Sequence, residues 1–142
     1  VTLVYLFGTW CPNCGDAGLF LRELQARYRE RGLRVVGLAF EHGDDEARIG
    51  RVLRDYAEQR GTDWPILRAG PSDKAGAAKA FPVLERVLAY PTTLFVGAGG
   101  AVRAVPTGFA GPAAPVEHEA QRRAFAALVE RLLRDEREDA PR

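Results

Sequence analysis

The chain has 142 residues, of which 46% are hydrophobic and 27% are charged, and its formal net charge is +1. This length is typical of one domain with one core, so we expect a single domain over residues 1–142, with a solvated tail at 135–142. The small net charge gives no electrostatic reason to expect nucleic acid or an anionic membrane as a partner. No apolar run approaches the ~20 residues that a membrane-spanning helix needs.

The first residue is Val1 rather than methionine, and the sequence VTLVYLF already reads as a strand. We therefore expect a trimmed or mature domain. A signal peptide or membrane anchor that preceded Val1 would not be visible in this sequence. The lack of a targeting segment is accordingly no evidence for the cytoplasm.

The first half of the chain alternates short apolar runs with helical patterns. Strands are indicated by apolar and β-branched runs, and helices by apolar residues that recur every three or four positions, with glycine as a stop signal. In chain order this predicts a buried strand at 3–8, a helix at 14–31 that stops at Gly32, a strand covered on both faces at 33–40, a helix capped by Asp44 or Asp45 that ends at Gly61, and a short strand at 64–67.

The second half predicts a short helix, a hairpin and a long helix. Ser72 would cap a helix through Ala80, followed by a second turn or two at 83–88. Two β-rich runs at 92–96 and 101–105 flank a glycine cluster, which is typical of an antiparallel hairpin. The last helix carries an apolar stripe formed by Phe125, Leu128, Val129, Leu132 and Leu133. Since the early strand–helix–strand units require parallel pairing, we predict an α/β fold with one mixed sheet.

The two cysteines are separated by two residues in the stretch GTWCPNCGD, residues 8–16. Pro12 favours the first helical position, which makes Cys11 the predicted N-cap. A thiolate at Cys11 would receive backbone N–H donors and the positive end of the helix dipole, and both favour the charged form. Cys14 lies one turn on, at roughly 5–6 Å between Cβ atoms. The spacing therefore predicts an attacking sulfur at Cys11 and a resolving sulfur at Cys14.

Two structural explanations of the cysteine pair are weaker. A disulfide that closes so short a loop would remove little entropy from the unfolded chain. A structural zinc ion usually needs four ligands, and only His42 and His118, far apart in sequence, could add to the pair. Reversible dithiol–disulfide exchange fits a Cys-x-x-Cys motif beside a strand–helix–strand unit, and it requires no cofactor and no metal.

The motif FGTWCPNC after an apolar strand, YPTT at the start of a later strand, and the order of elements resemble thioredoxin-fold proteins. The stretches VVGLAFEHGDD, WPIL and YPTTLFV followed by TGFAGP are similar to the TlpA/ResA-like branch of thiol–disulfide oxidoreductases. This resemblance implies a reductase outside the cytoplasm that exchanges electrons with protein dithiols and disulfides, including apocytochrome or metal-site cysteines. We also expect the protein to be a monomer. The family usually has further strand material before the first strand.

By this resemblance, Pro91 is a cis-proline beside the active disulfide. A proline at a strand start removes a backbone donor, and it leaves the backbone of Tyr90 free to pair with an extended substrate segment. Trp10 is expected to cover Cys11 and touch the substrate. The predicted substrate-binding residues are Trp10, Pro12, Asn13, Tyr90, Pro91 and Thr92.

One departure from the family pattern concerns the proton of the second cysteine. Thioredoxins carry a buried aspartate in the strand before the motif, whereas the matching position here is Tyr5, which cannot act as a base at neutral pH. Glu41 follows the strand at 33–40, at the sheet edge where active sites of parallel sheets gather. We predict that Glu41 takes and returns the proton of Cys14 during exchange. The alternative is a solvated loop glutamate.

Two other functions stay open. A thiol peroxidase would use a reactive cysteine in the same fold, but it normally has a hydroxyl residue three positions before that cysteine, whereas Thr9 lies two before Cys11. A non-enzymatic copper-binding module would use Cys11, Cys14 and His42 as soft ligands, although such proteins more often space their cysteines more widely.

Overall fold

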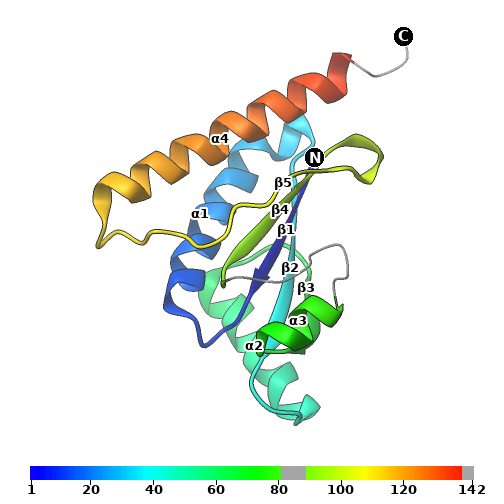
Figure 1. Ribbon diagram of the computed structural model, residues 1–142, viewed down its shortest axis with the longest axis vertical. Helices are drawn as coiled ribbons and strands as arrows, with labels where there is room; N and C mark the ends of the chain where they lie inside the picture. Colours follow the sequence, from blue (N-terminus) through cyan, green and yellow to red (C-terminus); the bar gives the residue numbers. More distant parts are fainter. Residues whose placement is uncertain (81–88, 139–142) are drawn as a thin grey trace.

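The computed structural model describes residues 1–80 and 89–138, which form a five-stranded sheet with helices on both faces (Figure 1). The strands are β1 (Thr2–Phe7), β2 (Arg34–Glu41), β3 (Ile66–Pro71), β4 (Thr92–Val96) and β5 (Val102–Ala104). Their order in the sheet is β3-β2-β1-β4-β5. The first three strands are parallel, and β4 is antiparallel to both β1 and β5. The predicted α/β class with one mixed sheet is confirmed.

The helices are α1 (Pro12–Tyr28), α2 (Glu46–Arg60), α3 (Lys74–Ala80) and α4 (Pro115–Glu138). Cys11 is the N-cap of α1, as its position before Pro12 predicted. Asp45 caps α2, because its side chain accepts from the backbone nitrogen of Arg48. Short 3-10 turns cover Arg29–Arg31 and Ala98–Gly100.

The two faces of the sheet bury different side chains because residues of a strand alternate in direction. Leu3, Tyr5 and Phe7 of β1 belong to the larger core, which includes residues of α1, α2 and α4. Leu6 belongs to a smaller core that includes Ala77 of α3. In Figure 1, α1 and α4 accordingly lie to the left of the strands and α3 to the right.

Three predicted boundaries in the middle of the chain were wrong. β3 covers Ile66–Pro71 instead of 64–67. It is an edge strand that contains polar and small residues, so it lacks the apolar run by which a buried strand is predicted. Asp73, not Ser72, accepts from the first turn of α3: its Oδ1 lies 2.7 Å from the backbone nitrogen of Gly76. β5 is shorter than the predicted 101–105. The helical turns predicted at 83–88 lie outside the described residues.

Part of the expected solvated tail at 135–142 is helical, and Asp135, Arg137 and Glu138 in it are exposed. The helix α4 continues through Glu138, because Arg134–Glu138 contains only residues that the helix tolerates and no glycine or proline. Glu136 lies against the start of the chain, with its Oε2 2.9 Å from the backbone nitrogen of Val1. Among the described residues, no helix combines the length and the hydropathy that crossing a bilayer requires.

Candidate active site

The two cysteines face each other across the first turn of α1. Cys11 has extended backbone angles, and its Sγ accepts a hydrogen bond from the backbone nitrogen of Cys14 at 3.3 Å. The helix therefore begins with a sulfur in the position where a capping oxygen usually stands. The backbone N–H of Cys14 is thus placed to stabilise negative charge on Cys11.

The two sulfurs differ in their access to solvent. Cys11 is 9% exposed, whereas Cys14 is 0% exposed. Burial raises the pKa of the Cys14 thiol well above its ordinary value, and the hydrogen bond with Cys11 raises it further. Hydrogen bonds from the backbone of Gly8 and from the side chain of Tyr5 lower this pKa. Cys11 is therefore the more accessible of the two cysteines, and Cys14 is fully buried.

The chain just before β4 lies opposite Cys11. The thiol of Cys11 is 3.8 Å from the carbonyl oxygen of Tyr90, to which it donates. The peptide bond between Tyr90 and Pro91 is cis, as the family resemblance implied. Pro91 is buried, and its carbonyl accepts from the backbone nitrogen of Gly108 at 2.7 Å. The Tyr90–Pro91 segment is in this way fixed next to the sulfur of Cys11.

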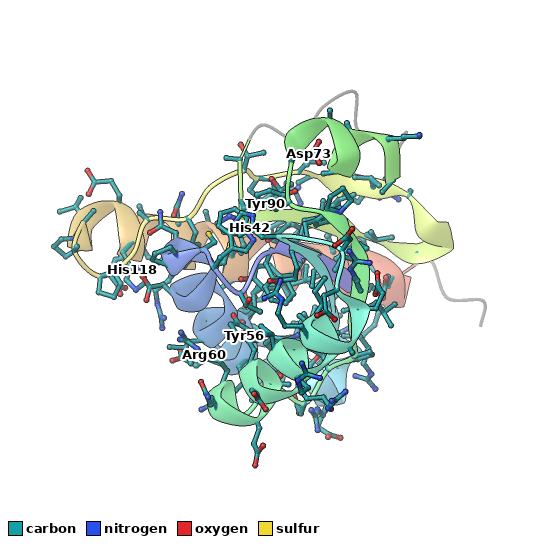
Figure 2. All side chains as sticks on the ribbon, turned by 90° about the horizontal axis from the view of Figure 1, so that it is seen from below. His42, Tyr56, Arg60, Asp73, Tyr90 and His118 are labelled. Atoms are coloured by element: carbon teal, nitrogen blue, oxygen red, sulfur yellow. The ribbon has the colours of Figure 1, made fainter. Side chains whose placement is uncertain are left out.

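Trp10 forms an aromatic rim beside the cysteine pair. It is 41% exposed, and its Nε1 donates to the carbonyl oxygen of Phe40 at 2.9 Å. Its ring lies 4.7 Å from that of His42 and 5.6 Å, edge to face, from that of Tyr90. Figure 2 shows His42 and Tyr90 close together at this edge of the sheet. The sequence suggested His42 only as a possible metal ligand; in the structure its ring packs against that of Trp10.

The remaining predicted contact residues are divided between the surface and the interior. Pro12 and Asn13 are exposed in the first turn of α1, next to Cys11. Thr92 is buried at the start of β4, where its hydroxyl donates to the carbonyl oxygen of Ala89 at 2.7 Å. The position of Thr92 suits a residue that holds the Pro91 segment rather than one that meets a partner.

Glu41 is buried at the end of β2 and bound to the motif loop. It is 5% exposed, and its two carboxylate oxygens accept from the backbone nitrogen of Thr9 at 2.7 Å and from the hydroxyl of Thr9 at 2.8 Å. The side chain is therefore not a solvated loop glutamate. The described residues show no hydrogen bond between Glu41 and Cys14, so the transfer of a proton between them stays a prediction.

A metal centre finds no support in the part of the chain that the structure describes. Within these residues, no group of three or more histidine, cysteine or acidic side chains could hold a metal ion. The ring nitrogen Nδ1 of His42 lies 2.6 Å from the hydroxyl of Ser72. The third soft ligand that a copper module would need is thus already paired.

Comparison with known proteins gives one curated relative. The chain is 23% identical over 106 residues to the thiol-disulfide oxidoreductase ResA of Oceanobacillus iheyensis. The aligned region covers 75% of this chain and 48% of that protein. The chain thus matches about half the length of this relative. No protein-family model matches the chain.

Solved structures extend the likeness to the whole fold. A putative thiol:disulfide interchange protein DsbE from Chlorobium tepidum superimposes with a TM-score of 0.68 at 17% identity, over 94% of this chain and 79% of that one. A secreted Mycobacterium tuberculosis disulfide oxidoreductase homologous to E. coli DsbE gives 0.55 at 15% identity, over 84% and 80%. The chain has a thioredoxin fold. Its resemblance to the TlpA/ResA-like family, expected from the motifs, is confirmed.

Within this thioredoxin fold, the residue that sequence reasoning undervalued is Tyr5. Its hydroxyl donates to the carbonyl oxygen of Cys14, so the side chain occupies the space behind the second cysteine. The sequence did mark Tyr5 as the position of the aspartate found in thioredoxins, but only as an absent base. Tyr56 on α2, whose hydroxyl also lies near Gly18 of α1, gave no sequence signal beyond its place in an apolar stripe.

Proposed function

We propose that the protein is a thiol–disulfide oxidoreductase that exchanges electrons with protein disulfides through Cys11 and Cys14. The observation that carries this proposal is the geometry of the α1 N-terminus. The Sγ atom of Cys11 is 3.3 Å from the backbone nitrogen of Cys14 and 3.8 Å from the carbonyl oxygen of Tyr90. An incoming disulfide would meet the sulfur of Cys11, which accepts a hydrogen bond from the backbone of Cys14 and has the sulfur of Cys14 one helical turn away.

In the first step, the thiolate of Cys11 attacks one sulfur of the partner disulfide. A bond forms between Cys11 and that sulfur, and the partner's S–S bond breaks. The second partner sulfur leaves with the electron pair and takes a proton from water. The product is a mixed disulfide between Cys11 and the partner.

In the second step, the thiolate of Cys14 attacks Cys11 and releases the partner as a dithiol. The partner has then gained two electrons, and the protein holds a disulfide between Cys11 and Cys14. A separate dithiol protein returns the electrons. We propose that Glu41 receives the proton of Cys14, a role supported by its burial at the same sheet edge and its link to Thr9.

The partner would lie along the rim formed by Trp10, Pro12, Asn13 and the Tyr90–Pro91 segment. Trp10, Pro12 and Asn13 are exposed neighbours of Cys11 in sequence, and the carbonyl oxygen of Tyr90, from a separate part of the chain, lies 3.8 Å from its Sγ. An extended substrate segment would pass over Trp10 and run beside the strand that begins at Thr92. Aromatic surface of this kind is common where one protein binds another.

The two alternative functions are less well supported. A peroxidase needs a hydroxyl beside the reacting sulfur, but the hydroxyl of Thr9 donates to Glu41. A copper module needs a further soft ligand, and the ring of His42 is engaged by Ser72 and Trp10.

We further propose that the protein acts as a monomeric reductase outside the cytoplasm. The family resemblance supports this location, and one structural neighbour is described as secreted. Fractionation of the natural host should recover the protein with extracytoplasmic enzymes, and sedimentation should give the mass of one chain. Recovery in the cytosol, or a stable dimer, would contradict these parts of the proposal.

The activity is tested by the reduction of insulin with dithiothreitol as the electron source. We expect the wild-type protein to accelerate precipitation of the insulin B chain, and Cys11→Ser to abolish the effect. Cys14→Ser should accumulate a mixed disulfide between Cys11 and insulin that a reductant releases. If Cys11→Ser retains the wild-type rate, the proposed function is wrong.

The role of Glu41 needs a separate comparison. Glu41→Gln keeps one oxygen acceptor for Thr9 but removes the proton acceptor, so we expect slower release of insulin from the mixed disulfide and a changed pH profile of this step. An unchanged rate and pH profile would exclude proton transfer by Glu41.

A further inference from the structure

Two tyrosine hydroxyls lie behind Cys14, and the reaction scheme above uses neither. Tyr5 on β1 is 1% exposed, and its hydroxyl donates to the carbonyl oxygen of Cys14. A Cβ atom at Gly18 would lie 3.3 Å from the hydroxyl oxygen of Tyr56 and 3.7 Å from that of Tyr5. Strand β1 and helix α2 therefore bring two hydroxyls to the buried side of α1, one turn from Cys14.

The hydroxyl of Tyr56 is buried, and it has no hydrogen-bond partner in the described part of the chain. A buried hydroxyl without a partner destabilises the folded protein, and such groups often have a functional explanation. Interaction with a charged Cys14 would explain this hydroxyl. Negative charge on Cys14 raises the pKa of both Tyr56 and Tyr5, which shows that the three groups interact. The two hydroxyls are in this way close enough to respond to the state of the resolving sulfur.

Both tyrosines keep their protons under the conditions of thiol exchange. Burial raises the pKa of Tyr5 well above its ordinary value, and burial raises the pKa of Tyr56 to about 12. A tyrosine that stays protonated can donate a hydrogen bond but cannot serve as a base. The pair is therefore suited to stabilise negative charge on Cys14, not to remove its proton.

Helix α1 leaves room for this arrangement by having glycine at two positions. A Cβ atom at Gly15 would lie 2.9 Å from a guanidinium nitrogen of Arg60, whose Cζ lies 5.6 Å from the centre of the Tyr56 ring. Figure 2 shows Tyr56 and Arg60 together on α2 beside the N-terminal half of α1. Arg60 brings a positive charge to the outer side of the tyrosine pair and lowers the pKa of Tyr56.

We propose that the hydroxyl of Tyr5, supported by Tyr56, turns from the carbonyl oxygen of Cys14 and donates to the Cys14 thiolate while this thiolate resolves the mixed disulfide. This inference rests on the proposed function. The proton of Cys14 passes to Glu41 in the scheme above. The thiolate then attacks Cys11, the bond between Cys11 and the partner breaks, and the partner sulfur leaves with the electron pair and takes a proton from water. Tyr5 gives up no proton during the step.

The titratable and charged groups that face Cys14 come from each element packed against it. They are Cys11 at the start of α1, Tyr5 on β1, Tyr56 on α2 and Tyr90 before β4. Arg60 lies against the ring of Tyr56, and Glu41 at the end of β2 is the proposed proton acceptor. Of these, Tyr5 is the group whose side-chain hydrogen bond lowers the pKa of Cys14. Removing its hydroxyl should therefore make the Cys14 thiolate harder to form.

The test follows the reaction of the reduced protein with dithiobis(nitrobenzoate) in a stopped-flow instrument. Attack by Cys11 releases one thionitrobenzoate, and the following attack by Cys14 releases the second, so the second phase reports the resolving step alone. In Tyr5→Phe we expect the pH midpoint of the second phase to move upward by about one unit, which makes the step about tenfold slower below the midpoint. The first phase should keep its wild-type pH dependence.

Tyr28→Phe is the matched control, because Tyr28 is a buried tyrosine of α1 whose hydroxyl donates to Glu130, far along the helix from Cys14. Its second phase should match wild type. Where Tyr5→Phe folds poorly, Tyr56→Phe should show a smaller upward shift. Unchanged midpoints in the Tyr5 and Tyr56 variants, or an equal shift in Tyr28→Phe, would overturn the inference. Release of only one thionitrobenzoate by the wild-type protein would instead overturn the proposed function.

Discussion

The carboxylate of Glu41 holds Thr9 by two hydrogen bonds, one from its amide at 2.7 Å and one from its hydroxyl at 2.8 Å. This contact joins the end of β2 to the loop between β1 and α1, two residues before Cys11. A buried carboxylate with both oxygens engaged fixes the position of the loop. Glu41 thus has a structural role that is separable from the proton transfer proposed for it.

A double-mutant cycle on this pair should show strong coupling. Glu41→Ala leaves the amide of Thr9 without its acceptor, so we expect the free energy of unfolding to fall by about 1–3 kcal/mol. Thr9→Ala removes the hydroxyl bond alone and should cost less. Urea unfolding of the two single variants and the double variant measures the coupling, and additive losses would show that the two side chains act independently.

Gly8 makes room for the indole of Trp10. A Cβ atom at Gly8 would lie 2.2 Å from Nε1 of Trp10, so Gly8→Ala must displace the ring and break its bond to the carbonyl of Phe40. We expect a shift in Trp10 fluorescence and a loss of about tenfold in insulin reduction, the value of one aromatic contact of about 1.4 kcal/mol. In a Trp10→Phe background, where only the buried Trp64 fluoresces, Gly8→Ala should leave the fluorescence unchanged.

Gly70→Ala is the control for this experiment, because a Cβ atom at Gly70 would make an ordinary 3.6 Å contact with Phe40. It should retain wild-type fluorescence and activity. If Gly8→Ala shifts the Trp10 fluorescence but reduces insulin at the wild-type rate, Trp10 does not contribute to partner binding.

The buried thiol of Cys14 should make the reduced protein lose stability in alkali. Its pKa in the folded protein is raised by burial above the ordinary 9.0, so the unfolded chain releases this proton first and stability falls as pH rises above about 9. Between pH 9 and 10 the loss from this one group is about 1 kcal/mol, and at higher pH it approaches about 1.4 kcal/mol per pH unit. Below the ordinary value its contribution is fully present.

Cys14→Ala lacks this group while it retains Cys11 and all the tyrosines, so its stability should change less over the same interval. The measurement is the slope of unfolding free energy against pH for the two reduced proteins, which separates the titration from the cavity that the substitution creates. Parallel slopes would mean that Cys14 titrates in the folded protein as it does in the unfolded chain.

The local chemistry of the site could be predicted because it depends on neighbours in sequence. Pro12 determines where α1 begins, and this alone places Cys11 at the N-cap and Cys14 one turn later. The stop at Gly61 also follows from one residue, which adopts the left-handed φ of 59°. Such features need no knowledge of tertiary packing.

The groups behind Cys14 could not be predicted, because they depend on how distant elements pack. Tyr5 and Tyr56 each look like core residues of their own element, and only the placement of α2 on the same face as α1 brings their hydroxyls together. The same holds for the contact between His42 and Trp10. The edge strand β3 was misplaced for a different reason: a half-exposed strand lacks the apolar run that was used to find it.

The most direct test of the account is the redox equilibrium of the cysteine pair in glutathione buffers, read by alkylation and mass measurement of the intact chain. We predict that one glutathione disulfide converts the dithiol into an internal Cys11–Cys14 disulfide with release of two glutathione molecules, with a midpoint near the thioredoxin value of about −270 mV for a reductase. Two alkylated thiols at every glutathione ratio, or a stable glutathione adduct on Cys11 with Cys14 still free, would contradict the central claim.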